Sequence, residues 1–241
     1  MIHLYGDSIT AGVPGVPFYK YLTPVRPFRA YGVGGDTVTG LLGRTTGIEL
    51  NADDQYVLEI GTNDILLPHL REQSISWRKT VEGIEKSGRR VTADVRDFAG
   101  KYSELLDKFS SEKTLVVSIP CVGEDTESDL NKKVDEYNDV IKRMCAERAR
   151  VFIDFNAWQK LEIQRTHVGN KAFISRNALG MIADVAMTKI DFISDVLSTK
   201  RNLCTTIDGV HLNSHGAEQM ARMIDRALAY KIAPDFAVKE E

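Results

Sequence analysis

The chain has 241 residues, of which 43% are hydrophobic and 27% are charged, and its formal net charge is −3 at pH 7. This length fits one large α/β domain, and the composition is that of a folded globular protein. The weak negative charge argues against a nucleic-acid-binding protein, which usually carries a clustered basic excess, and it indicates no polybasic membrane anchor.

The amino terminus has neither the basic segment nor the longer apolar run of a signal peptide. No apolar stretch approaches the roughly 20 residues that a helix needs to span a bilayer. The three cysteines, Cys121, Cys145 and Cys204, are widely spaced and odd in number. This pattern argues against a disulfide framework or a zinc cluster and predicts reduced, buried thiols. We therefore expect a cytoplasmic protein without an integral membrane segment.

Alternating apolar runs and amphipathic stretches predict the order of strands and helices. Short apolar runs predict strands at residues 2–5, 55–60, 115–119 and 151–154, and the segment 26–31, which ends at Gly32, is taken as a further strand. A short helix is predicted after the turn at 14–17, and longer ones at 37–44, 93–110, 129–148 and 215–230. Asp36 is the expected N-cap of the helix at 37–44. Strands that alternate with helices predict an α/β fold in which helices cover both faces of a mainly parallel five-stranded sheet.

Two segments look like insertions into a single domain that spans residues 1–241. The first, residues 70–92, is polar and basic, and a solvated surface helix is favoured over a site for an anionic headgroup or a phosphorylated substrate. Its basic residues are Arg71, Arg78, Lys79, Lys86, Arg89 and Arg90.

The second insertion, residues 159–205, has apolar residues at helical spacing, which predict one long helix. They are Ile182, Val185, Ala186, Ile190, Ile193, Val196 and Leu197. Packing on the sheet or in an oligomer contact is favoured over a lid above the acyl pocket, because apolar stripes at this spacing usually belong to a core.

Polar and glycine-rich motifs follow the predicted strands. Gly-Asp-Ser-Ile occupies residues 6–9, Gly-Val-Gly-Gly-Asp-Thr residues 32–37, and Gly-Thr-Asn-Asp residues 61–64. A fourth motif, Asp-Gly-Val-His-Leu, lies at 208–212. Ligands of open parallel sheets bind outside the carboxyl ends of the strands. The motifs are therefore expected to meet in one site.

The residue types in these motifs fit acyl transfer, which needs a nucleophile, a base, a group that orients the base, and donors for the oxyanion. Ser8 would be the nucleophile, and His211 would take its proton and return it to the leaving group. Asp208 would hold the other ring nitrogen. The backbone N–H groups of Ser8 and Gly35 and the amide of Asn63 are the candidate oxyanion donors. Asp7, Asp36 and Asp64 are expected to cap helices or brace loops.

Together these motifs resemble the SGNH (GDSL) hydrolases, a family of esterases, lipases, thioesterases and carbohydrate deacetylases. The resemblance extends from residue 1 to about 230 outside the two insertions, and it favours Gly35 over Gly34. It implies a flavodoxin-like three-layer sandwich, a Ser8–His211–Asp208 triad, an oxyanion hole of Ser8, Gly35 and Asn63, and no metal or organic cofactor.

Several alternatives stay open at this level. His211 and His215 are four residues apart and could bind a metal together with Asp208, although no His-Glu-x-x-His arrangement is present. A nucleotide-binding module is disfavoured, since the second loop lacks Gly-x-Gly-x-x-Gly spacing. A hydrolase fold kept as a binding protein is disfavoured because every expected side chain is present. The expected partner is a small-molecule ester, thioester or acetylated sugar. The acyl and alcohol specificity and the oligomeric state are not encoded in these motifs.

Overall fold

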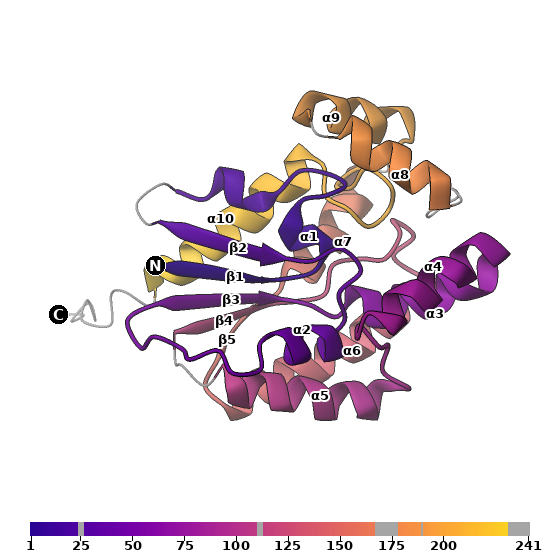
Figure 1. Ribbon diagram of the computed structural model, residues 1–241. Coiled ribbons are helices and arrows are strands. Elements are labelled where there is room, and N and C mark those ends of the chain that lie inside the picture. Colours follow the sequence, from indigo (N-terminus) through magenta and orange to yellow (C-terminus); the bar gives the residue numbers. More distant parts are fainter. Residues whose placement is uncertain (24–26, 110–112, 167–177, 189, 231–241) are drawn as a thin grey trace.

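The computed structural model describes residues 1–23, 27–109, 113–166, 178–188 and 190–230. Its centre is a five-stranded, fully parallel sheet with the strand order β2-β1-β3-β4-β5 (Figure 1). The strands are β1 (Ile2–Gly6), β2 (Phe28–Gly32), β3 (Gln55–Glu59), β4 (Thr114–Val117) and β5 (Val151–Ile153). This is the order of flavodoxin-like folds, so the predicted fold class is confirmed.

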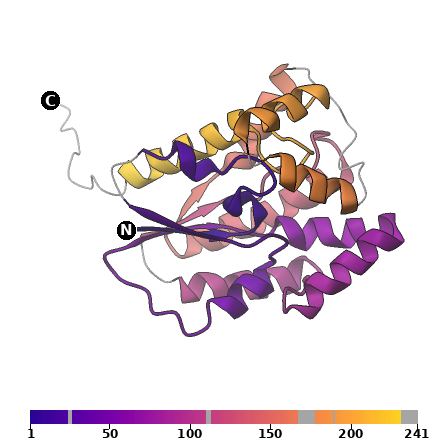
Figure 2. The same cartoon turned by 45° about the horizontal axis from the view of Figure 1, so that its top comes forward.

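Helices cover both faces of the sheet, as Figure 2 shows in a view close to the sheet edge. One face carries α2 (Val38–Arg44), α5 (Val95–Lys108) and α6 (Asp129–Glu147). The other carries α1 (Ser8–Ala11), the 3₁₀ turn η1 (Phe18–Tyr21), α7 (Phe155–Thr166) and α10 (Ser214–Tyr230). Strand residues such as Leu4, Leu58 and Val116 are fully buried between the layers, as expected for parallel strands that are covered on both sides.

Four further helices lie beyond the carboxyl ends of the strands (Figure 1). They are α3 (Thr62–Gln73), α4 (Ile75–Lys86), α8 (Ala178–Met187) and α9 (Asp191–Lys200). Helix α4 contacts both α3 and α8. The basic segment at 70–92 is therefore the end of α3, the helix α4 and the chain that follows it.

The prediction of one long helix in residues 159–205 is wrong. Helices α8 and α9 are separate there, and Ile190 is the extended N-cap residue of α9, with φ −115° and ψ 115°. Two members of the apolar stripe, Ile182 and Ile190, are 64% and 60% exposed. The helical spacing is therefore real within each helix, but these two side chains do not enter a core.

The N-cap of α2 also differs from the prediction. The Thr37 hydroxyl accepts the hydrogen bond from the Gly40 N–H, so Thr37 is the cap. The Asp36 carboxylate instead accepts from the Thr37 N–H and from the Arg44 side chain. Asp36 thus stabilises the loop before the helix through hydrogen bonds and does not cap the helix.

Two other expectations concern the cysteines and the membrane. Cys121 and Cys145 are free and buried, as predicted, whereas Cys204 is free but partly exposed. Among the described residues, no helix is both long enough and apolar enough to cross a bilayer.

Candidate active site

The site lies where three parallel strands end side by side. Ser8 follows β1, Gly35 follows β2 and Asn63 follows β3, and β1 is hydrogen-bonded to both neighbours. The chain moves to one side of β1 to form β2 and to the other side to form β3. Such a switch point opens a crevice at the carboxyl edge of the sheet.

Ser8, His211 and Asp208 form a continuous hydrogen-bonded chain. His211 Nε2 lies 2.9 Å from Ser8 Oγ, and His211 Nδ1 lies 2.7 Å from Asp208 Oδ2. The second carboxylate oxygen of Asp208 accepts from the N–H groups of Val210 and His211, which closes the turn between the two residues. Asp7 caps α1 by accepting from the Ile9 N–H, so Ser8 is the first residue of this short helix. All three predicted residues therefore meet.

The two titratable members of this chain shift each other's pKa in opposite directions. Burial lowers the pKa of His211, but the charge and hydrogen bond of Asp208 outweigh burial and hold that pKa above its ordinary 6.5. Burial raises the pKa of Asp208, but His211 and the backbone donors outweigh it and hold that pKa below its ordinary 3.8. The arrangement therefore stabilises an imidazolium next to a carboxylate, as a general base requires once it has taken a proton.

The backbone conformation of the second loop requires a glycine at position 35. Gly35 has φ +71°, a conformation that side chains with a Cβ rarely adopt. A Cβ there would also lie 3.1 Å from Ile84 Cδ1 on α4, whereas a Cβ at Gly34 would meet nothing. The Gly35 N–H has no hydrogen-bond partner in the described part of the chain.

The Asn63 side chain joins the loops that follow β1, β2 and β3. Its amide nitrogen donates to the Asp36 carbonyl at 2.9 Å and to Asp7 Oδ2 at 3.2 Å. Because both partners are acceptors, the amide nitrogen and not the amide oxygen faces them.

Buried carboxyl groups surround these loops. Burial raises the pKa of both Asp7 and Asp64 to about 7, and it raises the pKa of Glu59 well above its ordinary value. Asp64 accepts from the Val38 N–H and from Thr92, and Glu59 accepts from the Thr10 hydroxyl. As expected, Asp7 and Asp64 hold loops in place through hydrogen bonds.

Two residues that hold chain segments of the site in place were not predicted from the sequence. The Glu124 carboxylate accepts from the backbone N–H groups of Cys204, Thr205 and Thr206, and so fixes the chain that leads to Asp208. The Arg44 guanidinium donates to Asp36 and to the carbonyls of Gly6 and Tyr31, at the ends of two strands. Glu124 lies 80 to 82 residues from its partners, and Arg44 lies 8 to 38 residues from its partners, so no short spacing pattern predicts these contacts.

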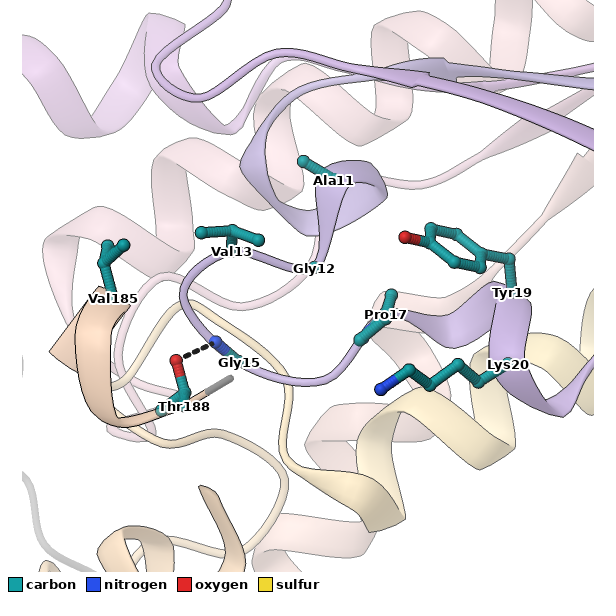
Figure 3. A pocket seen from close by; sticks show the side chains of 9 residues that line it. All are labelled: Ala11, Gly12, Val13, Gly15, Pro17, Tyr19, Lys20, Val185 and Thr188. Atoms are coloured by element: carbon teal, nitrogen blue, oxygen red, sulfur yellow. Dashed lines mark hydrogen bonds between the residues drawn. The ribbon is translucent and has the colours of Figure 1, made fainter. Parts of the chain in front are cut away.

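Helix α8 and Thr188, the residue that follows it, contact the chain around the site at two places. The Gly15 N–H donates to Thr188 Oγ1 at 3.1 Å, beside a hollow of about 220 Å³ that Val13, Tyr19 and Val185 help to line (Figure 3). None of Ser8, Asp208 and His211 lines this hollow.

The second contact is an ion pair between Arg201 and Asp184 of α8. The guanidinium binds both Asp184 oxygens, at 3.0 and 2.8 Å, and donates to the Ile207 carbonyl at 2.6 Å, one residue before Asp208. The Asp184 side chain is only 3% exposed. The pair therefore joins α8 to the loop that carries Asp208 and His211.

We expect Arg201→Met to destabilise the protein by about 3–5 kcal/mol, because it removes a guanidinium that binds both oxygens of the buried Asp184 carboxylate. Urea unfolding at neutral pH measures this change. Arg148→Met is the matched control: its partner Asp107 is 64% exposed, so a loss of at most about 1 kcal/mol is expected. Equal losses in the two variants would contradict the role given to the Arg201 pair.

His215 does not join His211 in a metal site. Its Nε2 atom lies 3.0 Å from Glu162 Oε1, and its ring packs against Trp158 of α7. Within the described residues, no group of three or more His, Cys, Asp or Glu side chains could hold a metal ion. The arrangement of His211, His215 and Asp208 considered from the sequence is therefore not formed.

Comparison with protein families identifies the class of hydrolase to which a chain with this fold belongs. Residues 4–219 match the GDSL-like Lipase/Acylhydrolase family. The chain belongs to this family and is a hydrolase that acts on ester bonds. No curated protein matches the chain.

Solved structures with the same fold include several esterases. An acetyl xylan esterase, AlAXEase, is 20% identical with a TM-score of 0.60, over 94% of this chain and 98% of that one. The lipase/acylhydrolase from Enterococcus faecalis is 19% identical with a TM-score of 0.54, over 95% of each chain. Axe2, an acetylxylan esterase from Geobacillus stearothermophilus, is 15% identical with a TM-score of 0.53, over 99% of this chain and 96% of that one. At these identities the likeness shows the common fold.

Proposed function

We propose that this protein hydrolyses carboxylic esters or thioesters of small molecules through an acyl-enzyme intermediate on Ser8. The observation that carries the proposal is the hydrogen-bonded chain from Ser8 Oγ through the His211 ring to Asp208. A nucleophile, a base and a group that orients the base in this order are the parts that acyl transfer needs.

In the first step, His211 Nε2 takes the proton from Ser8 Oγ as the oxygen attacks the ester carbonyl. Asp208 keeps the proton on Nδ1, so Nε2 is free to accept, and it stabilises the imidazolium that forms. The negative charge that develops on the carbonyl oxygen is held by the N–H groups of Ser8 and Gly35 and by the Asn63 amide. The imidazolium then protonates the leaving alcohol or thiol.

In the second step, water replaces the alcohol. His211 takes a proton from the water, which attacks the acyl-enzyme, and then returns it to Ser8 Oγ as the acid product leaves. No group besides the protein and water is needed to balance the reaction.

A fluorophosphonate reagent tests this proposal, because it traps the activated serine of such enzymes. We expect one phosphonyl group on Ser8, identified by peptide mass spectrometry, and a matching loss of p-nitrophenyl acetate hydrolysis. Labelling at another residue, or full activity after complete labelling, would reject Ser8 as the nucleophile.

A second candidate is removal of acetyl groups from a carbohydrate or small metabolite by the same residues. It is favoured by the acetylxylan esterases among the proteins of similar fold. Rates on acetylated xylo-oligosaccharides, simple esters of graded acyl length and acyl-CoA, measured beside the labelled enzyme, distinguish these substrate classes.

A further inference from the structure

Arg89 lies next to the second loop of the site, in the basic segment that the sequence analysis treated as solvated surface. Its Nη1 atom donates to the carbonyl oxygen of Gly34, and its Nε atom donates to Ser87 Oγ at 2.8 Å. The guanidinium is thus anchored on two sides, and its position follows the end of α4, which packs near the carboxyl edge of the sheet (Figure 1).

The carbonyl that Arg89 binds belongs to the same peptide unit as the N–H of Gly35. This peptide is planar and trans, so its C=O and N–H point in opposite directions. A donor that holds the Gly34 oxygen on one side therefore fixes the direction of the Gly35 N–H on the other side. A hydrogen bond from a cation also polarises the peptide, which makes its N–H a stronger donor.

The neighbouring contacts show that the segment around Arg89 is built against this loop. The Arg90 carbonyl accepts from the hydroxyl groups of Thr37 and Thr39. A Cβ at Gly40 would lie 2.7 Å from Arg89 Cγ, so the arginine stem fills the space that this glycine leaves. Arg89 is partly buried, whereas Arg90 is exposed.

We propose that Arg89 is a positioning residue that directs and polarises the Gly35 N–H for oxyanion binding. This inference rests on the proposed function, in which Gly35 is an oxyanion donor. It gives the basic segment a role in transition-state stabilisation rather than in binding an anionic substrate.

The test compares Arg89→Met, Arg89→Lys and Arg90→Met on two acetyl esters, neutral phenyl acetate and anionic 4-acetoxybenzoate. Removing a whole oxyanion donor costs on the order of 10²–10³ in kcat, so weakening one should cost about 10-fold. We expect Arg89→Met to show this loss on both esters, with KM within about twofold of the wild type. Arg89→Lys should recover part of kcat, and Arg90→Met should match the wild type.

A boronic acid inhibitor supplies a readout that a purely structural role would not move. Its tetrahedral adduct imitates the transition state, so its inhibition constant should rise by the same factor by which kcat/KM falls. Thermal unfolding checks that each variant is folded. If Arg89→Met does not fold, Arg89→Gln replaces it, because it keeps a donor but loses the charge, and a severalfold lower kcat is expected.

Two results would overturn the inference: unchanged kcat in a folded Arg89→Met or Arg89→Gln variant, and a rise in KM confined to 4-acetoxybenzoate, which would make Arg89 a substrate-anion site. Ser8→Ala, assayed in parallel, separates this inference from the proposed function. Loss of activity in Ser8→Ala with no loss in the Arg89 variants would reject only the role of Arg89.

Discussion

Replacement of Ser8 by alanine is expected to lower kcat for p-nitrophenyl acetate by on the order of 10⁶-fold, as in other serine hydrolases whose nucleophile is removed. The variant keeps the donors around Gly35 and Asn63, so a residual rate above that of water is expected from oxyanion binding alone. The fold should remain, because within the described part of the chain the Ser8 hydroxyl makes a single side-chain hydrogen bond, to His211. Steady-state kinetics and thermal unfolding measure the two quantities.

Ser118→Ala is the matched control for this variant. Ser118 is another buried serine, and its hydroxyl accepts from the Asn156 N–H at 2.8 Å. Its loss should lower the unfolding free energy by about 1–3 kcal/mol and leave kcat unchanged. Turnover by Ser8→Ala within tenfold of the wild type would be incompatible with Ser8 as the nucleophile.

The sequence predicted those features that depend on neighbouring residues. Four of the five strands were visible as short apolar runs, and three of the four site motifs followed a predicted strand directly. The parallel sheet then brought Ser8, Gly35 and Asn63 to one edge without further information, because all of its strands point the same way. His211 and Asp208 were readable as a pair since they lie three residues apart on one turn.

Helices that depend on tertiary context were harder to predict. Helix α3 begins inside the Gly-Thr-Asn-Asp motif and contains Pro68, a residue that normally argues against a helix interior. The break between α8 and α9 has no glycine or proline to mark it. The apolar residues of the two helices follow one continuous helical spacing, so periodicity alone could not show that the helices are separate.

The supporting shell of the site could not be read from sequence at all. Glu124 binds backbone groups that are 80 to 82 residues away, and Arg89 binds a carbonyl 55 residues away. A lone glutamate or arginine carries no local signal of such a partner. Arg89 is an example: its charge suggested solvent or an anionic ligand, whereas in the structure its Nη1 atom donates to a neutral carbonyl oxygen of the second loop.

Asp208→Asn is the second variant for which a large loss is expected, about 10⁴-fold in kcat. The asparagine oxygen can keep the bonds to the Val210 and His211 N–H groups, so the turn is preserved. Its amide nitrogen would then face His211 Nδ1 as a donor. This contact favours the tautomer with the proton on Nε2, which cannot accept the proton of Ser8.

Glu162→Gln is the control for this variant, because it removes the carboxylate from another histidine–carboxylate pair, at His215. We expect it to leave kcat unchanged, and an equal loss in both variants would contradict a specific role for Asp208.

Asp208→Asn should also shift the pH dependence of the reaction. Asp208 holds the pKa of His211 above its ordinary value against the opposing effect of burial. His211 must be neutral to act as a base, so wild-type kcat/KM should rise with pH through this elevated pKa. Without the carboxylate, burial dominates and the pKa of His211 falls, so the acidic limb of the residual activity should move to lower pH. A limb that stays in place or moves to higher pH would show that Asp208 does not set the protonation of His211.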